Sequence, residues 1–202
     1  MLVHPTVMLS STARDLPAHR KAACNACLQL GFFPSMMEHL PASDASAVTV
    51  SLGLVDEAEI YLGIFAYRYG YIPTEEQLLE AERVHKCSLP RGVSITELEY
   101  RRATDMGRKR LIFLVHEDHR PPWREQDIES GSGAAKLQAL LERLGRGHTV
   151  AFFRSAEELQ RKVEEALLPL RSEALRALHQ LPRPVDDFVD RREELSILQA
   201  AV

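Results

Sequence analysis

The chain has 202 residues, of which 45% are hydrophobic and 27% charged, and its formal net charge at pH 7 is -4. Such a chain can bury one sizeable core, and its slightly acidic balance argues against a general surface for nucleic acid or an anionic membrane. Three cysteines provide no disulfide framework, and the longest apolar runs are too short to span a bilayer. We therefore expect a soluble, cytoplasmic protein with neither a nucleic-acid nor a membrane partner.

Short apolar runs alternate with helical patterns in the first third of the chain. Thr6–Ser10 is apolar and β-branched, which predicts a strand, and the serine and threonine after it favour a helix start before a periodic segment at 16–30. Gly31 is a typical helix stop. The elements expected next are a strand at 32–37, a helix at 46–55 and a strand at 59–66.

The second half continues the alternation after a long connection at 68–90, which contains a predicted helix at 75–84. A polar loop is expected at 116–133. The closing helix should break near Pro169, because proline lacks the N–H that the helix needs. The other elements expected here are a helix at 94–106, a strand at 110–115, a helix at 134–144, a strand at 149–153 and a closing helix at 156–180.

This alternation predicts a three-layer, flavodoxin-like α/β fold, with a mostly parallel five-stranded sheet and helices on both faces. The runs YLGIFA and LIFLV are apolar at successive positions, as in strands that are buried on both sides. In such sheets, ligands bind beyond the carboxyl ends of the strands, near the switch in strand order. The polar residues expected at this edge are Ser10, Ser11, Thr12, Arg14, Asp15, Glu38, His39, Arg68, Tyr69, Thr96, Glu97 and Glu99.

The composition changes after Leu181, where two prolines and two aspartates predict a stiff polar linker at 182–187. The sequence FVDRREEL then begins a new element. We therefore assign residues 1–181 to the α/β domain and residues 182–202 to a linker and the truncated start of a further module.

Two motif matches are better explained by structure than by chemistry. Cys24 and Cys27 form a CxxC pattern, but they lie inside a predicted helix and not at its start, where a thiolate would be stabilised. Zinc needs four ligands, and Cys87 lies on a distant loop, so we expect no metal site. The segment 131–136 has glycines like a phosphate loop but not its spacing, which favours a flexible loop.

Several polar pairs have two open interpretations. Ser11 and Thr12 could hold a phosphate or carboxylate, or could simply cap a helix. Arg68 could bind phosphate beside a base stacked on Tyr69, or could pair with an acid to order its loop. Glu38 and His39 are consecutive and point to opposite sides, so only one of them can face the crevice.

Glu97 and Glu99 lie in the first turns of the predicted helix at 94–106, where negative charge is stabilising in any protein. Two positions apart on a helix, they do not share a face. One of them could point into the crevice, where a carboxylate could stabilise a sugar cation or attack its anomeric carbon. Residue patterns alone leave both carboxylates as candidates.

Four segments follow one another along the chain: VMLSSTARDL, LGFFPSMMEHLPAS, VDEAEIYLGIFAYRYG and SITELEYRRATDMGRKRLIFL. In sequence and in order they resemble the DUF4062 family (domain of unknown function), and the likeness covers roughly residues 5–118. Members of this family are usually N-terminal modules of STAND-type, NLR-like signalling ATPases. The family is similar to Toll/interleukin-receptor (TIR) domains and to nucleoside deoxyribosyltransferases, and the tail FVDRREEL is similar to the opening of STAND ATPase modules.

The resemblance separates the two carboxylates. In deoxyribosyltransferases a threonine precedes the nucleophilic glutamate by three positions, and Thr96, Glu99, Ala103 and Gly107 match that register. It implies a catalytic Glu99, with NAD or a related nucleotide as the substrate and no cofactor. The implied partners are the chain's own ATPase module and further copies of itself on activation; the alternative is a non-catalytic homotypic interaction or scaffold module. The residues implied to bind the substrate are Ser11, Thr12, Arg14, Arg68, Tyr69 and Thr96.

Overall fold

The computed structural model describes residues 4–12, 15–117 and 128–178. The chain divides into two units, Met1–Arg171 and Ser172–Val202. The sheet, helices α1 to α5 and the two cavities described below belong to the first unit. The predicted linker and module start at 182–202 lie outside the described residues, as does Arg14.

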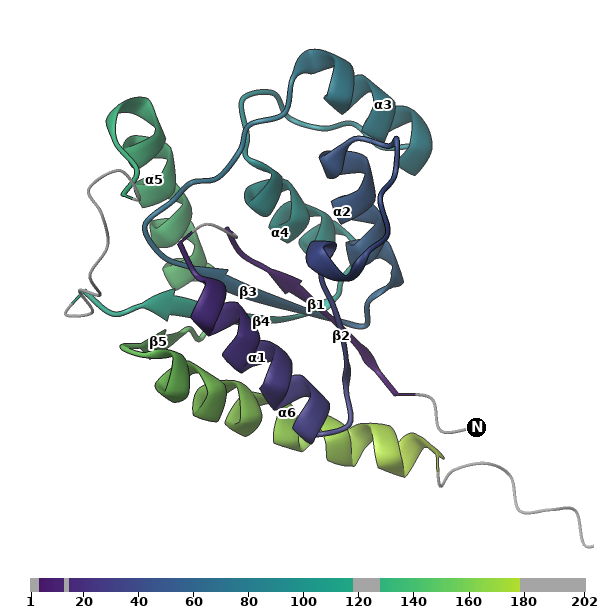
Figure 1. Cartoon of the computed structure of the whole chain (residues 1–202), viewed down its shortest axis with the longest axis vertical. Helices are drawn as coiled ribbons and strands as arrows, with labels where there is room; N and C mark the ends of the chain where they lie inside the picture. The colour runs from purple at the N-terminus through teal and green to yellow at the C-terminus, as the bar shows by residue number, and fades with distance from the viewer. Residues whose placement is uncertain (1–3, 13–14, 118–127, 179–202) are drawn as a thin grey trace, which may run out of the picture. The chain divides into compact units, whose positions relative to one another are not determined.

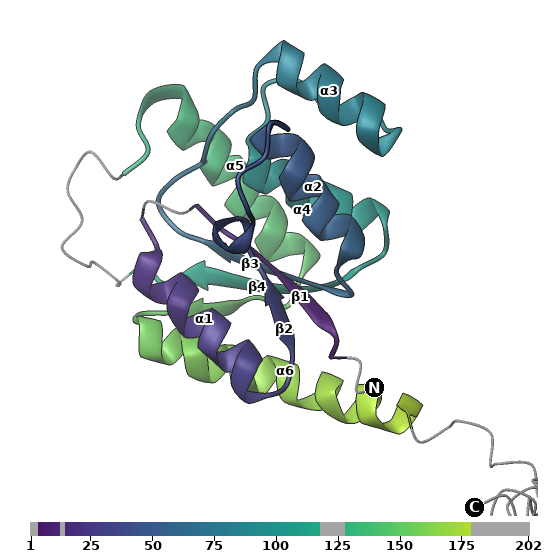
Figure 2. The same cartoon turned by 45° about the vertical axis from the view of Figure 1, so that its right-hand side comes forward.

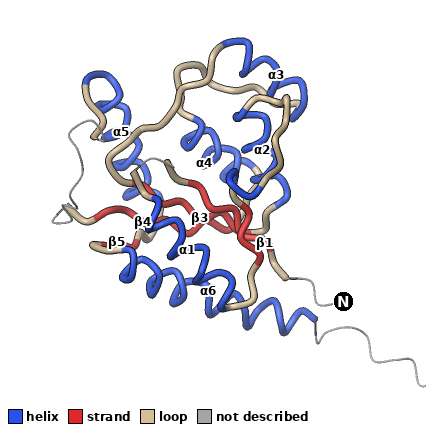
Figure 3. The backbone as a smooth tube through the Cα atoms, in the orientation of Figure 1, coloured by secondary structure: helices blue, strands red, loops and turns tan. Residues whose placement is uncertain are grey.

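A five-stranded, all-parallel sheet forms the centre of the first unit, in the order β2-β1-β3-β4-β5. Its strands are red in Figure 3. This strand order confirms the predicted flavodoxin-like fold. In the middle strand, Leu62 lies beside Leu9 on one side and Leu111 on the other. The strands are β1 (Thr6–Ser10), β2 (Phe33–Ser35), β3 (Ile60–Phe65), β4 (Lys109–Val115) and β5 (Ala151–Phe153).

Helices cover both faces of the sheet (Figures 1 and 2). Helices α1 and α6 pack on the face that carries Leu62 and Ile64, whereas α2, α4 and α5 pack on the face that carries Tyr61 and Phe65. Helix α3 packs on α2 and α4 instead of on the sheet. The helices are α1 (Pro17–Gln29), α2 (Ala47–Glu57), α3 (Glu75–His85), α4 (Ile95–Asp105), α5 (Gly131–Gly147) and α6 (Ala156–Leu178), with a 3-10 turn at Met37–His39.

Two local predictions were wrong. Helix α6 continues through Pro169. Pro169 and Glu165 are both exposed, so the carbonyl that loses its N–H partner can bond to water. Helix α5 begins at Gly131, so the glycine-rich segment forms its first turn and is not a flexible loop.

The cysteines of the CxxC pattern belong to the packing of α1. Cys27 is fully buried in the core, and burial raises the pKa of its thiol to about 12. Cys24 is half-buried and packs against the same cluster. None of the helices in the described ranges has the length and apolar character needed to cross a membrane.

Candidate active site

A cavity of about 580 Å³ opens at the carboxyl ends of β1 and β3, the strands between which the chain order switches. This volume is typical of small-molecule sites, and the position is the one where open α/β sheets bind ligands. Its walls come from the end of β1, the loops after β1 and β3, the 3-10 turn after β2, and the first turns of α1, α2 and α4. The lining residues are Met8, Leu9, Ser10, Ser11, Thr12, Arg20, Met37, Glu38, Ala47, Ser51, Arg68, Gly70, Tyr71, Ile95, Thr96, Glu99 and Glu129.

Glu99 reaches the cavity from α4, whose first turn is capped by Ser94; the Ser94 hydroxyl accepts a hydrogen bond from the N–H of Glu97. The Glu99 carboxyl accepts a hydrogen bond from Ser10 Oγ at 2.5 Å. Ser10 Oγ in turn accepts one from the Tyr61 hydroxyl at 2.9 Å. A chain of hydroxyl groups therefore runs from the buried core to the carboxyl.

Burial dominates the electrostatics of Glu99, which is only 5% exposed. Desolvation raises its pKa to about 7, against the opposing effects of the Ser10 hydroxyl and the Arg20 charge. At neutral pH the carboxyl is thus divided between its protonated and ionised forms. Shifted carboxyl groups of this kind, set in a cleft, are typical of acid, base and nucleophile roles.

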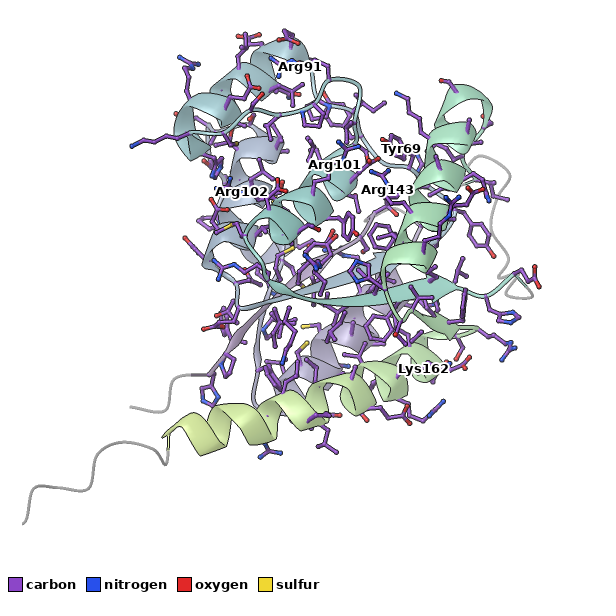
Figure 4. All side chains as sticks on the ribbon, turned by 180° about the vertical axis from the view of Figure 1, so that it is seen from behind. Tyr69, Arg91, Arg101, Arg102, Arg143 and Lys162 are labelled. Carbon is purple, nitrogen blue, oxygen red and sulfur yellow. The ribbon has the colours of Figure 1, made fainter. Side chains whose placement is uncertain are left out.

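Glu97 has the opposite environment. Its carboxylate accepts hydrogen bonds from the Tyr69 hydroxyl at 2.6 Å, from Arg101 Nη2 at 2.7 Å and from Arg143 Nη2 at 2.7 Å. Burial would raise the pKa of Glu97, but these three donors outweigh it and hold the pKa below its usual value. Figure 4 shows Tyr69, Arg101 and Arg143 close together where α4 faces α5. Glu97 is an ion-pair centre outside the cavity.

Sequence patterns did not point to Arg20, a buried arginine on α1 that lines the cavity. It donates Nε and Nη2 to the two oxygens of Glu38, at 2.7 and 2.6 Å, and Nη1 to Ser11 Oγ at 2.6 Å. Burial opposes the effect, but this paired contact keeps the pKa of Glu38 low. The only sequence signal was an arginine one turn into the helix that follows β1, which is common on any helix.

The structure brings together most of the predicted binding residues. Ser11, Thr12, Arg68 and Thr96 all line the cavity. Tyr69 does not: its side chain is buried in the core cluster with Tyr61 and Tyr100, and its hydroxyl donates a hydrogen bond to Glu97.

Tyr71 lines the cavity in place of Tyr69. Of the consecutive residues Glu38 and His39, only Glu38 lines it. Glycine at position 70 lets the loop after β3 pass close to Thr12 and Thr96. Its φ is +96°, and a Cβ there would lie only 3.3 Å from Thr12 Cγ2 and 3.4 Å from Thr96 Oγ1. Within the described ranges, no group of three or more His, Cys, Asp or Glu side chains is placed to hold a metal ion.

The strand order, with a cavity at its switch point, defines a flavodoxin-like α/β domain. The chain belongs to the DUF4062 family, a domain of unknown function, whose model matches residues 6–168. A search of curated proteins found no matching sequence.

Three solved structures are similar in fold, each at 12% identity. A CMP N-glycosidase, BcmB, from Clostridium botulinum has a TM-score of 0.43 and covers 79% of this chain and 98% of its own. A flavodoxin from the Archaea has a TM-score of 0.39, and the match covers 86% of this chain and 99% of the flavodoxin. The TIR domains of the activated Roq1 resistosome have a TM-score of 0.37, and the match covers 98% of this chain and 97% of the TIR chain. At these values the likenesses describe the fold and carry no argument about activity.

Proposed function

We propose that the cavity cleaves the N-glycosidic bond of NAD or a related nucleotide, with Glu99 as the catalytic carboxylate. The observation that carries this proposal is a buried carboxyl of pKa about 7 on the wall of a cavity that also contains Arg68 and Arg20. Arginines bind phosphate through paired N–H groups, so such a cavity suits an anionic ligand with a sugar.

In the proposed reaction, the bond between the anomeric carbon and the base nitrogen breaks and its electron pair leaves with the base. The ring oxygen shares the positive charge that develops at the anomeric carbon, and ionised Glu99 stabilises or captures that cation. Water then adds its oxygen to this carbon and releases a proton to solvent. Where Glu99 has captured the cation, the bond from its oxygen to the carbon breaks at this step and the carboxylate is restored. Nicotinamide in NAD is a cationic leaving group and departs neutral, so it needs no proton donor.

Ser11, Thr12, Thr96 and Arg68 supply hydroxyl and guanidinium groups around Glu99 that would orient the ribose and phosphate. Arg20 and Glu38 form a rigid pair beside them. Arg14 and Tyr69 were also expected to bind the substrate. Arg14 lies outside the described residues, and we no longer assign a binding role to Tyr69.

The test compares the wild type with the Glu99→Gln and Asp105→Asn variants. Each is incubated with NAD and with several nucleosides, and chromatography measures the rate at which the free base is released. Asp105 is an exposed carboxylate on the same helix, so it is a matched control. We expect Glu99→Gln to lose at least ~100-fold in rate, in line with the loss of an essential catalytic group, and Asp105→Asn to keep wild-type turnover. Equal turnover by Glu99→Gln would exclude this function.

We further propose that the chain acts as the N-terminal effector module of a cytoplasmic STAND ATPase, and that clustering of copies activates it. The support is the family membership and the tail FVDRREEL. The assay should therefore include the full-length protein or artificially clustered chains. If clustered chains release no base and Glu99→Gln leaves signalling intact, the non-catalytic homotypic or scaffold role replaces the enzymatic one.

A further inference from the structure

We propose that a second pocket, on a different face of α4 from the Glu99 cavity, binds the phosphate group of a small phosphate monoester. The pocket has a volume of about 450 Å³, which is enough for a compact organic phosphate. It lies between α4, the segment after α3 and α5. Its lining residues are Cys87, Ser88, Leu89, Pro90, Leu98, Tyr100, Arg101, Arg102, Thr104, Asp105 and Arg143.

An excess of positive charge lies at one end of this pocket. Arg101 and Arg143 both donate to the same oxygen of Glu97, which serves as the single carboxylate for two guanidinium groups. Glu97 is buried beneath them, with a side chain 3% exposed, whereas the arginine side chains are 39% and 43% exposed. Among the described residues, the two arginines thus share one carboxylate where they line the pocket, which leaves an excess of one positive charge at this end.

The other end of the pocket carries a net negative charge, from one arginine and two carboxylates. Arg102 donates Nε and Nη2 to the two oxygens of Asp56, at 2.7 and 3.0 Å. Asp105 acts electrostatically on Arg102 and Cys87, which places its negative charge at this end. An anion should therefore bind at Arg101 and Arg143, not at Arg102.

The geometry favours phosphate over a simple halide. Arg143 uses one of its five N–H groups on Glu97 and Arg101 uses two, so both can also bind an oxyanion through paired N–H groups. The exposed Ser88 hydroxyl adds a donor, and the apolar side chains of Leu89, Pro90 and Leu98 form a wall for an organic substituent. A phosphate with an apolar substituent uses both parts of the pocket.

The experiment is a titration of the folded chain with inorganic phosphate and with phenyl phosphate at constant ionic strength. Calorimetry gives the affinity, and the NMR signals of the arginine Nε–H groups report which arginines respond. Arg143→Met should bind roughly tenfold more weakly, the effect expected when a charged hydrogen-bond donor is lost. Arg146→Met is the matched control, since Arg146 lies on the same helix, is 81% exposed and does not line the pocket.

Phenyl phosphate should bind more tightly than inorganic phosphate, with shifts at Arg101 and Arg143. Arg101→Met repeats the test if Arg143→Met does not fold, because Arg143 still holds Glu97. Equal losses in Arg143→Met and Arg146→Met, equal affinity for the two ligands, or the same response to chloride would overturn the proposal. Glu99→Gln should bind phosphate within about twofold of the wild type, so this result is independent of the proposed glycosidic activity.

Discussion

Ser10, at the end of β1, donates its hydroxyl to the carboxyl of Glu99, on the first turns of α4. This contact joins the central sheet to the helix that carries the candidate catalytic group. It holds the carboxyl at the switch in strand order, where burial raises its pKa to about 7 although the hydrogen bond itself lowers it.

Glu99→Gln should make the protein more stable at pH 8. The pKa of Glu99 is about 7 in the folded chain and 4.5 in an ordinary glutamate, so ionising the buried group costs as much as about 3 kcal/mol of stability above pH 7. This cost begins as pH rises past 4.5 and is complete above 7. The gain should thus disappear below pH 4.5. Urea unfolding of the wild type and the variant at pH 8 and pH 4 measures the difference in stability. A variant less stable than the wild type at pH 8 would contradict the raised pKa of Glu99.

The rate of base release should rise with pH through the pKa of Glu99 and level off above it, because the ionised form is the one that stabilises a cation. Ser10→Ala removes a hydrogen bond that lowers this pKa, so the rise should move to higher pH. Ser51 also lines the cavity, and its hydroxyl also lowers the pKa of Glu99. Ser51→Ala should therefore move the rise in rate to higher pH as well. A rate that falls above pH 7 would instead assign Glu99 as a proton donor.

Glu97→Gln should destabilise the fold by about 1–3 kcal/mol at pH 7, because the variant weakens the buried acceptor of Tyr69, Arg101 and Arg143. The pKa of Glu97 is lowered, so its stabilisation exists above the ordinary value of 4.5 and is lost as pH falls. The penalty should shrink towards pH 3. Glu142→Gln, an exposed partner of Arg146, should change stability by less than about 0.5 kcal/mol.

Gly70→Ala should lower both stability and substrate affinity. Its φ of +96 disfavours any side chain, and an added Cβ would crowd Thr12 and Thr96 on the cavity wall. Gly107→Ala is the control, because its φ is +64 but no atom lies within 4 Å of an added Cβ. Both variants should lose about 1 kcal/mol or more by urea unfolding, and only Gly70→Ala should raise KM.

The order of strands and helices could be predicted because the signals are local. Apolar runs identify buried strands, and serine or glycine at the ends of periodic segments marks helix boundaries. The prediction for Pro169 failed because Pro169 and Glu165 lie on the exposed side of α6, where the freed carbonyl can bond to water, and which side of the helix faces solvent depends on the fold. Tyr69 was misplaced for a similar reason, since the turn after β3 decides which tyrosine faces the cavity.

Local residue patterns were enough to predict the parallel α/β architecture and the edge of the sheet where polar residues would gather, because apolar periodicity and right-handed crossovers follow from neighbouring residues. The environments of the two carboxylates depend instead on contacts between segments that are distant in the chain. Glu97 and Glu99 lie two positions apart in the same helix turn. The Glu97 carboxylate nevertheless accepts hydrogen bonds from three donors, whereas the Glu99 carboxyl is desolvated and accepts one from the Ser10 hydroxyl. The pKa of a carboxyl depends on burial and on side chains from distant segments, and the folded chain alone brings these together.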